Sequence, residues 1–281
     1  MPELAEVEFF RKRWEVAHGE TVVLVHVRPP ARIFRGLDAV ELARALAGRR
    51  LLDSAARAKQ MRFRFSGGGH LGIHLGMAGE LETQPVGQGR DGHAHLILET
   101  AESALIFSDF RMFGRVQWHV GPEEPDWWAG LPPDVISRQF TRELVATFLQ
   151  RRTKAPLKAI LLMQERFPGI GNWMADEILW RARLRPDALG GELNAEQTTR
   201  LYRKTREVAR DALREIAGMG TRKTMHSLEK NVPDHWLFNH RWKDGGTCPK
   251  TGQPLIRQQL GGRTTCWSPA WQREPFLERL S

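Results

Sequence analysis

Residues 60–76 of the chain read Gln-Met-Arg-Phe-Arg-Phe-Ser-Gly-Gly-Gly-His-Leu-Gly-Ile-His-Leu-Gly. Residues 60–65 alternate between polar and apolar side chains, which is the period of a strand with one buried face. The glycines that follow favour a turn, and residues 71–76 have the composition of another strand. The stretch therefore predicts two β-strands separated by a glycine-rich turn.

The same strand-like signal extends on both sides of this stretch. Further strands are expected at residues 21–27, 95–99, 104–108 and 115–119, separated by Gly, Asp and Pro clusters. One helix, at about residues 38–47, interrupts them. Because helices do not alternate with the strands, the pattern favours an antiparallel sandwich or barrel over a parallel sheet.

The composition becomes helical after a segment rich in proline. Helices are expected at residues 141–151, 156–166, 173–182 and 195–217, and a small β-hairpin is expected between residues 238 and 272. The sequence thus predicts an α+β fold, with an N-terminal antiparallel β-sandwich, flanking helices, and a helical domain that ends in a β-hairpin finger. The expected boundaries are 1–121 for the sandwich, 122–137 for a linker, 138–237 for the helical domain, 238–274 for the finger and 275–281 for a tail.

The charge of the chain indicates an anionic partner. The 281 residues include 42 Lys and Arg against 33 Asp and Glu, a formal net charge of +9, and the isoelectric point is near 10.1. Such a balance suits nucleic acid or an anionic membrane surface. We find neither a long apolar segment nor a secretory signal. The only cysteines, Cys248 and Cys266, fit a reducing compartment, so a soluble cytoplasmic protein is expected.

The N-terminus, Met1-Pro2-Glu3-Leu4-Ala5-Glu6-Val7-Glu8, carries candidate chemistry. If Met1 is removed, Pro2 becomes a secondary amine, and terminal amines have a pKa of about 8, low enough to be partly nucleophilic at neutral pH. Attack of this amine on an aldehyde-like carbon would give an iminium, and Glu3 could move the protons that the step requires. The alternative is that the segment is only the start of an amphipathic helix over residues 3–17, with one apolar face. That face would consist of Leu4, Val7, Phe10 and Trp14.

Two predicted loops carry exposed apolar side chains. They are residues 74–79, His-Leu-Gly-Met-Ala-Gly, and residues 109–114, Asp-Phe-Arg-Met-Phe-Gly. Each could be an ordinary hairpin loop. Apolar wedges with an arginine are also the side chains that fill the gap when a protein extrudes a base from duplex DNA.

A tight turn at residues 167–172, Phe-Pro-Gly-Ile-Gly-Asn, joins two of the expected helices. Its glycines would let backbone N–H groups and a helix N-terminus approach a phosphate, with Asn172 as helix cap and donor. Taken alone, the turn is more typical of an ordinary interhelical connection.

Together these segments resemble the formamidopyrimidine-DNA glycosylase and endonuclease VIII family, bifunctional enzymes of base-excision repair. The resemblance runs from Pro2 to Gln272, and Ala5 replaces the second proline that is usual in the family. The motifs that carry it are Pro2-Glu3-Leu4 with Glu6, the Lys59 segment, His74-Leu75-Gly76-Met77-x-Gly79, Asp109-x-Arg111-x-Phe113-Gly114, Gly169-Ile170-Gly171-Asn172 with Ala175-Asp176-Glu177, and Gly262-Arg263-Thr264-Thr265.

The resemblance implies a role for each site residue. Pro2 would attack C1′ of the damaged nucleotide, and Glu3 would act as general acid and base with Glu6 in the same catalytic group. Lys59 would assist base departure and phosphate binding. The void left by the extruded base would be filled by Met77, Arg111 and Phe113. Phosphate contacts would come from His93, Lys158, Asn172 and, at the tip of the finger, Arg263.

The finger departs from the family pattern, which is a four-cysteine zinc site. Cys248 stands at the first ligand position, but Thr251, Ser268 and Trp271 stand at the other three. Two thiols alone do not complete a structural zinc site. His235 and His240 could supply the missing pair, but lone histidines in a loop are usually ordinary loop residues. We therefore expect a finger without zinc, packed by Leu255, Ile256, Trp267 and Trp271, and no other cofactor.

The resemblance implies a DNA glycosylase with AP-lyase activity that acts as a monomer on damaged double-stranded DNA. It would proceed by a Schiff base on Pro2 and β,δ-elimination. The wedge residues favour excision of 8-oxoguanine and formamidopyrimidines, although Met112 replaces a usual arginine and the lesion-capping loop, expected within residues 219–234, is unusual. The alternatives are a glycosylase for oxidised pyrimidines, a catalytically idle damaged-DNA-binding protein, and a general RNA-binding module.

Overall fold

The computed structural model describes residues 1–88, 92–219 and 232–274. The chain divides into two compact units, one made of residues 1–131 and 217–222 and the other of residues 132–216 and 223–281. The first boundary between them falls within the segment expected to be a linker. In the described part of the chain, none of the helices has the length and apolar character needed to cross a membrane.

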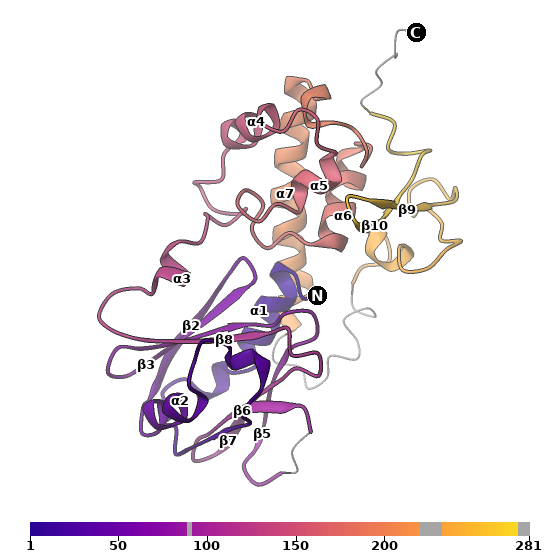
Figure 1. Cartoon of the computed structure of the whole chain (residues 1–281). Helices are drawn as coiled ribbons and strands as arrows, with labels where there is room; N and C mark the ends of the chain where they lie inside the picture. The colour runs from indigo at the N-terminus through magenta and orange to yellow at the C-terminus, as the bar shows by residue number, and fades with distance from the viewer. Residues whose placement is uncertain (89–91, 220–231, 275–281) are drawn as a thin grey trace. The chain divides into compact units, whose positions relative to one another are not determined.

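The first unit contains two four-stranded antiparallel sheets. One sheet has the order β1 (Leu24–Val27), β6 (Ala94–Glu99), β7 (Ser103–Ser108), β5 (Glu80–Pro85). The other has the order β2 (Leu51–Arg57), β3 (Gln60–Phe65), β4 (Gly69–His74), β8 (Arg115–Val120) (Figure 1). The expected strands are confirmed, and β3 has the expected bounds. Strands β2 and β5 were missed because their sequences, LLDSAAR and ELETQP, contain only one β-branched residue, Thr83, and no aromatic residue.

Helix α1 (Leu4–Lys12) connects the N-terminus to both sheets, since it contacts β2 and β3 of one and β5 of the other. The expected apolar face is confirmed, because Leu4, Val7, Phe10 and Trp14 are all buried. The Trp14 indole lies 4.7 Å from the Phe63 ring, and its Nε1 donates a hydrogen bond to the Glu82 carbonyl. The chain start is thereby fixed to the sandwich. The remaining short helices of this unit are η1 (Glu15–Ala17), η2 (Arg32–Phe34), α2 (Ala39–Leu46), α3 (Asp126–Ala129) and η4 (Ala217–Met219).

The second unit is built around helix α6 (Asn172–Ala182), whose side chains are buried on almost every face. It packs against α5 (Leu157–Leu161), α7 (Ala195–Glu215) and strand β10 (Arg263–Trp267), which pairs with β9 (Ile256–Leu260) in the expected hairpin. The other elements are α4 (Arg142–Gln150), η3 (Gly190–Glu192) and η5 (Leu237–His240). The fold class expected from the sequence is confirmed.

Helix α5 is shorter than the expected residues 156–166. Gln164 replaces helix hydrogen bonds with side-chain bonds, because its Nε2 donates to the Leu162 and Ile170 carbonyls and its Oε1 accepts from the Gly169 N–H. A side chain that satisfies backbone groups in this way stabilises a turn at the expense of helix. The helix therefore ends at Leu161, and the following residues form the turn that leads into α6.

Candidate active site and nucleic-acid interface

The first turn of α1 places Pro2 directly before a buried carboxyl group. Glu3 is the residue that caps α1, and only 2% of its surface is exposed. Its backbone N–H donates to Oε2 of Glu6 at 3.0 Å, so both acidic residues belong to one hydrogen-bonded helix start. A buried carboxyl group next to the chain start is held where it could exchange protons with the Pro2 nitrogen.

Lys59 lies in the tight turn between β2 and β3 and is also largely buried, with 8% of its surface exposed. Ala58, just before it, has the left-handed φ of 55° that such a turn requires. The residue after Lys59, Gln60, pairs with His74 at the end of β4. Lys59, which is expected to assist base departure, thus lies close to His74 at the end of the sheet where β3 begins and β4 ends.

His74, at this end of the sheet, is held in its neutral form. Burial, and then the positive charges of Lys59 and Arg35, lower its pKa to about 4. Its Nδ1 accepts a hydrogen bond from the Gly76 N–H at 3.0 Å, which requires an unprotonated Nδ1. The histidine therefore acts as a neutral support for the turn that presents Met77.

The loop after β7 is organised by the buried carboxylate of Asp109. Its Oδ1 accepts from the Arg111 N–H at 3.1 Å, and its Oδ2 accepts from the Gly114 N–H at 2.7 Å. This arrangement projects the side chains of the loop outward, since Phe113 is 41% exposed. The Arg111 guanidinium lies 5.1 Å from the Phe113 ring centre, so the expected wedge residues stack on each other.

Met77 lies beside this loop. A Cβ built on Gly76, which has a φ of +62°, would come within 2.4 Å of the Phe113 carbonyl carbon. The two turns therefore touch at their backbones, and 39% of the Met77 surface is exposed. The structure brings together the three wedge residues expected from the sequence. It places His93, also exposed, against Phe110 with a ring separation of 6.2 Å.

In the second unit, Lys158 is completely buried. Its Nζ donates to the Asn172 carbonyl at 2.6 Å and to Oδ1 of Asp176 at 2.5 Å. The expected phosphate contact of this lysine stays a prediction, but in this structure its ammonium group points to protein acceptors.

Asn172 is the first residue of α6, and the helix cap is Gly171, so the cap expected at Asn172 is one residue too late. The Asn172 side chain instead donates through Nδ2 to the Thr264 carbonyl at 2.9 Å. Thr264 follows Arg263, which is exposed at the start of β10, just past the hairpin turn. Asn172 is thus hydrogen-bonded to the residue that directly follows Arg263.

The finger does not present a set of zinc ligands. Among the described residues, no group of three or more His, Cys, Asp and Glu side chains could hold a metal. Burial alone would raise the pKa of Cys248, but hydrogen bonds with Ser268, Thr251 and Trp180 outweigh it and lower the pKa of this thiol. The family's ligand positions are thus occupied by a hydrogen-bonded cluster, and these residues do not fit a four-cysteine site.

The hairpin packs largely as expected. Leu255 and Trp267 are buried, and Trp271 packs against a hydrophobic cluster that includes Cys248 and Cys266. Ile256 was expected in this packing but is 42% exposed, because it is Leu255, just before β9, whose side chain is buried.

Two site features had little signal in the sequence. Asp109 and Asp176 stand within the motifs quoted above, but those motifs do not indicate that the two carboxylates are buried hydrogen-bond acceptors. Arg241, whose Nη2 lies 2.5 Å from Asp176 Oδ2, belongs to no motif. The lesion-capping loop expected within residues 219–234 lies mostly outside the described residues.

Comparisons with known proteins agree over nearly the whole chain. Residues 1–116 match the family model of the formamidopyrimidine-DNA glycosylase N-terminal domain, and residues 131–224 match that of the formamidopyrimidine-DNA glycosylase H2TH domain. A Thermus thermophilus protein named formamidopyrimidine-DNA glycosylase is 35% identical over 282 residues, covering 98% of this chain and 99% of that protein. Its namesake from Carboxydothermus hydrogenoformans is 30% identical over 274 residues, covering 97% and 100%.

The fold is similar to that of a solved enzyme–DNA complex. The Lactococcus lactis formamidopyrimidine-DNA glycosylase, crystallised with DNA that contains a formamidopyrimidine derivative of guanine, has a TM-score of 0.84 to this chain. The two are 23% identical, and the match covers 97% of this chain and 100% of that one.

Proposed function

The chain belongs to the formamidopyrimidine-DNA glycosylase family, and from that premise we propose that it removes oxidised bases from duplex DNA through a covalent intermediate on Pro2. As a member of the family it is a DNA glycosylase of base-excision repair. The proposal adds the AP-lyase step, Pro2 as the nucleophile, and the excised lesion. The favoured lesions are 8-oxoguanine and formamidopyrimidines. The observation that carries it is the Pro2-Glu3 pair, in which a buried carboxyl group adjoins the chain start.

The proposed reaction begins with the amine of Pro2, which bonds to C1′ of the damaged nucleotide while the bond from C1′ to the base breaks. A proton goes to the departing base, and Lys59 assists this departure. Glu3 then donates a proton to the sugar-ring oxygen, the ring opens, and the C1′–N bond becomes an iminium. The iminium withdraws electrons from C2′, so loss of a C2′ proton expels the 3′ phosphate by β-elimination, and δ-elimination removes the 5′ phosphate.

The wedge residues support the choice of a duplex substrate. A base that leaves the stack leaves a gap, and exposed Met77, Arg111 and Phe113 are the side chains proposed to fill it. Held by Asp109 and by the Gly76 turn, they are already placed before DNA binds. Action as a monomer in the cytoplasm stays a prediction.

Borohydride trapping tests the mechanism, because reduction freezes the iminium as a covalent protein–DNA complex. Labelled duplexes would carry 8-oxoguanine opposite cytosine, 5-hydroxyuracil or a bare abasic site, and wild type would be compared with Pro2→Gly and Glu3→Gln. We expect trapping by the wild type, strongest with 8-oxoguanine of the two base lesions, and weaker trapping by Pro2→Gly. Trapping of the 5-hydroxyuracil duplex alone would replace the lesion assignment, and binding without trapping of any duplex would indicate an idle damaged-DNA-binding protein.

The mechanism also requires that Met1 be removed, because a retained methionine would convert the Pro2 nitrogen into an amide. Intact mass of the active protein purified from cells measures this directly. Active protein that fully retains Met1 would rule out Pro2 as the nucleophile.

A further inference from the structure

Two hydrogen bonds attach strand β10 to helix α6 immediately after Arg263. Asn172 Nδ2 donates to the Thr264 carbonyl at 2.9 Å, and the Cys266 N–H donates to Oδ2 of Asp176 at 3.0 Å. Both anchors come from the first turns of α6. The main chain of the strand that begins with the exposed Arg263 is thus held by two side chains from the first turns of α6.

Asp176 is the centre of this attachment. Its Oδ1 accepts from Lys158 Nζ at 2.5 Å, and its Oδ2 accepts from Arg241 Nε and Nη2 at 3.1 and 2.5 Å as well as from Cys266. The group is dry, since the side-chain exposures are 0% for Lys158, 0% for Asp176 and 4% for Arg241. One carboxylate therefore joins four parts of the unit: α5, α6, the segment after η5, and β10.

Lys158 also orients the second anchor. Its Nζ donates to the carbonyl of Asn172 at 2.6 Å, the same residue whose side chain holds Thr264. The lysine thus touches both residues that hold the hairpin and is sealed from solvent on every side. For this ammonium group to reach a DNA phosphate, it would have to leave two acceptors and break the dry cluster.

We propose that Asp176 is a positioning residue that sets the place of Arg263, and that Lys158 and Arg241 act on DNA through Asp176 and the hairpin. The inference rests on the proposed function in that Arg263 is taken as a phosphate contact. It replaces the direct phosphate contact expected for Lys158. A buried carboxylate with several cationic donors suits this role, because its donors define one geometry and a neutral substitute could not satisfy them all.

A double-mutant cycle on DNA binding separates the two roles of Lys158. The dissociation constant for a duplex with a tetrahydrofuran abasic-site analogue is measured against salt for Lys158→Met, Asp176→Asn, Arg263→Ala and the two doubles with Arg263→Ala. Each lost phosphate contact reduces the slope of log affinity against log salt by about one. We expect each single variant to lose about one, and each double to lose no more than Arg263→Ala alone.

Several results would overturn the proposal. If Lys158→Met and Arg263→Ala add to a loss of about two, the lysine contacts a phosphate directly. If Arg263→Ala leaves the affinity and the salt slope unchanged, Arg263 makes no phosphate contact for Asp176 to position. Failure of the proposed mechanism is distinguishable, because it appears as absent borohydride trapping by the wild type.

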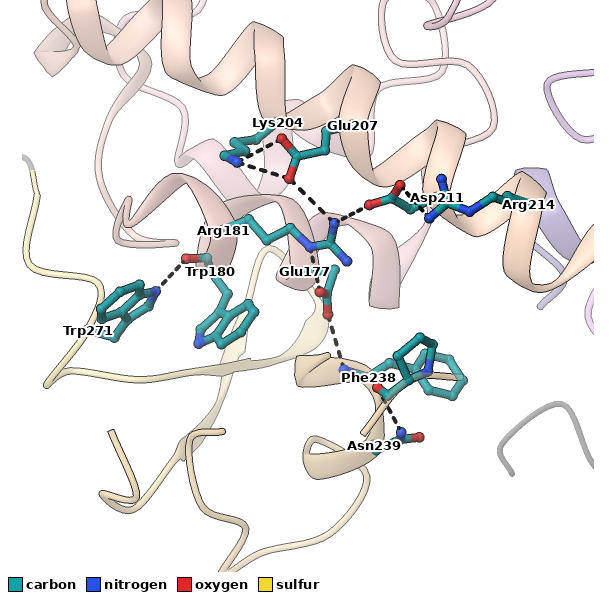
Figure 2. A network of polar contacts seen from close by, with 11 residues as sticks. Glu177, Trp180, Arg181, Lys204, Glu207, Asp211, Arg214, Phe238, Asn239 and Trp271 are labelled. Atoms are coloured by element: carbon teal, nitrogen blue, oxygen red, sulfur yellow. Dashed lines mark hydrogen bonds and ion pairs between the residues drawn. The ribbon is translucent and has the colours of Figure 1, made fainter. Parts of the chain in front are cut away.

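The same unit offers a matched control in a second polar cluster (Figure 2). There Arg181 Nη1 donates to Asp211 Oδ2 at 2.6 Å and Arg181 Nε donates to Glu177 at 2.8 Å. Asp211 also accepts from Arg214, and no hydrogen bond described here joins Asp211 to the hairpin. Asp211→Asn should therefore leave the salt slope at the wild-type value, and a reduced slope would show that any lost ion pair in the unit has this effect.

Folding of each variant is checked by circular dichroism before binding is measured. If Asp176→Asn does not fold, Lys158→Met and Arg241→Lys complete the cycle, because each leaves the carboxylate with at least one cationic partner. Lys158→Arg is the conservative variant. It keeps the positive charge but not the compact ammonium geometry. We expect Lys158→Arg to have the wild-type salt slope when Arg263 is present. When Arg263 is alanine, Lys158→Arg should have the same slope as Arg263→Ala alone.

Discussion

Oδ2 of Asp109 accepts a hydrogen bond from the backbone N–H of Gly114 at 2.7 Å, across the loop that carries the wedge residues. Oδ1 of the same carboxylate accepts from the Arg111 N–H, and Asp109 itself is fully buried. A loop closed by both oxygens of one carboxylate has its shape fixed before any ligand arrives. The exposed Phe113 and the guanidinium above it therefore need little ordering when DNA binds.

Asp109→Asn should destabilise the protein and weaken its binding to lesion DNA. The amide keeps one acceptor oxygen, but its NH₂ group would face a backbone N–H, which leaves a buried donor unsatisfied. We expect the free energy of unfolding to fall by about 2 kcal/mol in denaturant titrations. Asp244→Asn is the control, because its side chain is 88% exposed, and its effect should stay within about 0.5 kcal/mol. Equal effects of the two substitutions would contradict the role given to Asp109.

Gly76→Ala should damage the wedge more than a glycine substitution elsewhere. Gly76 has a φ of +62°, and a Cβ there would lie 2.4 Å from the Phe113 carbonyl carbon. Gly36 also has a positive φ, of +77°, but its Cβ would meet nothing within 4 Å. We expect Gly36→Ala to cost only the conformational strain, about 1 kcal/mol, with normal trapping of the DNA intermediate. Gly76→Ala should cost more than that and reduce trapping, and identical behaviour would exclude a close contact between the two turns.

Parts of this site follow from the sequence and parts do not. Strand β3 was predicted with its observed bounds because its alternation is regular, whereas β2 and β5 carry small or polar residues and gave no signal. The wedge segments were found because exposed Met and Phe in loops are unusual. The sequence does not indicate that Arg241, 65 positions after Asp176, would donate hydrogen bonds to its carboxylate, since such a contact depends on how the chain packs.

The burial of Lys158 is a second feature that could not be predicted from the sequence. Its place in the sequence was compatible with a phosphate contact, and nothing in its neighbours indicated a side chain with no exposed surface. Residue type and spacing can identify a cation, but only packing decides whether its charge faces solvent or a buried carboxylate.

Stability should fall on acidification below pH 6.5 in a way that depends on His74. Its pKa is lowered from 6.5 to about 4 by burial and by the nearby cations, so the unfolded chain binds a proton there more readily than the folded one. The stabilisation is complete above pH 6.5 and is lost as the pH falls towards 4, by up to about 3 kcal/mol.

Denaturant titrations of wild type and His74→Asn measure this contribution. Asn keeps an acceptor near the Gly76 N–H but does not titrate. The stability difference between the two proteins should narrow by about 2 kcal/mol from pH 7 to pH 5. A difference that is independent of pH would show that His74 is not held neutral.

Trp271 should do for the finger what zinc does in a four-cysteine site. Its Nε1 donates to the Trp180 carbonyl at 3.0 Å, the Arg183 guanidinium lies 3.9 Å from its ring centre, and the ring packs against the cluster that contains Cys248. We expect chelators to leave DNA binding unchanged and metal analysis of the purified protein to find no bound zinc. Trp271→Ala should reduce the free energy of unfolding by about 3 kcal/mol and weaken DNA binding, because the hairpin that carries Arg263 loses its packing.

Trp242→Ala is the matched control for this substitution, because its side chain belongs to the same region but is 49% exposed. It should cost much less stability than Trp271→Ala and leave binding intact. A different result would be one bound zinc per chain together with loss of DNA binding on chelation. It would show that other metal ligands hold the finger and that the contacts of Thr251, Ser268 and Trp271 do not replace the metal. Tolerance of both tryptophan substitutions would show that the hairpin is held to α6 by the Asp176 and Asn172 bonds and by the buried cluster that contains Trp180 and Cys266.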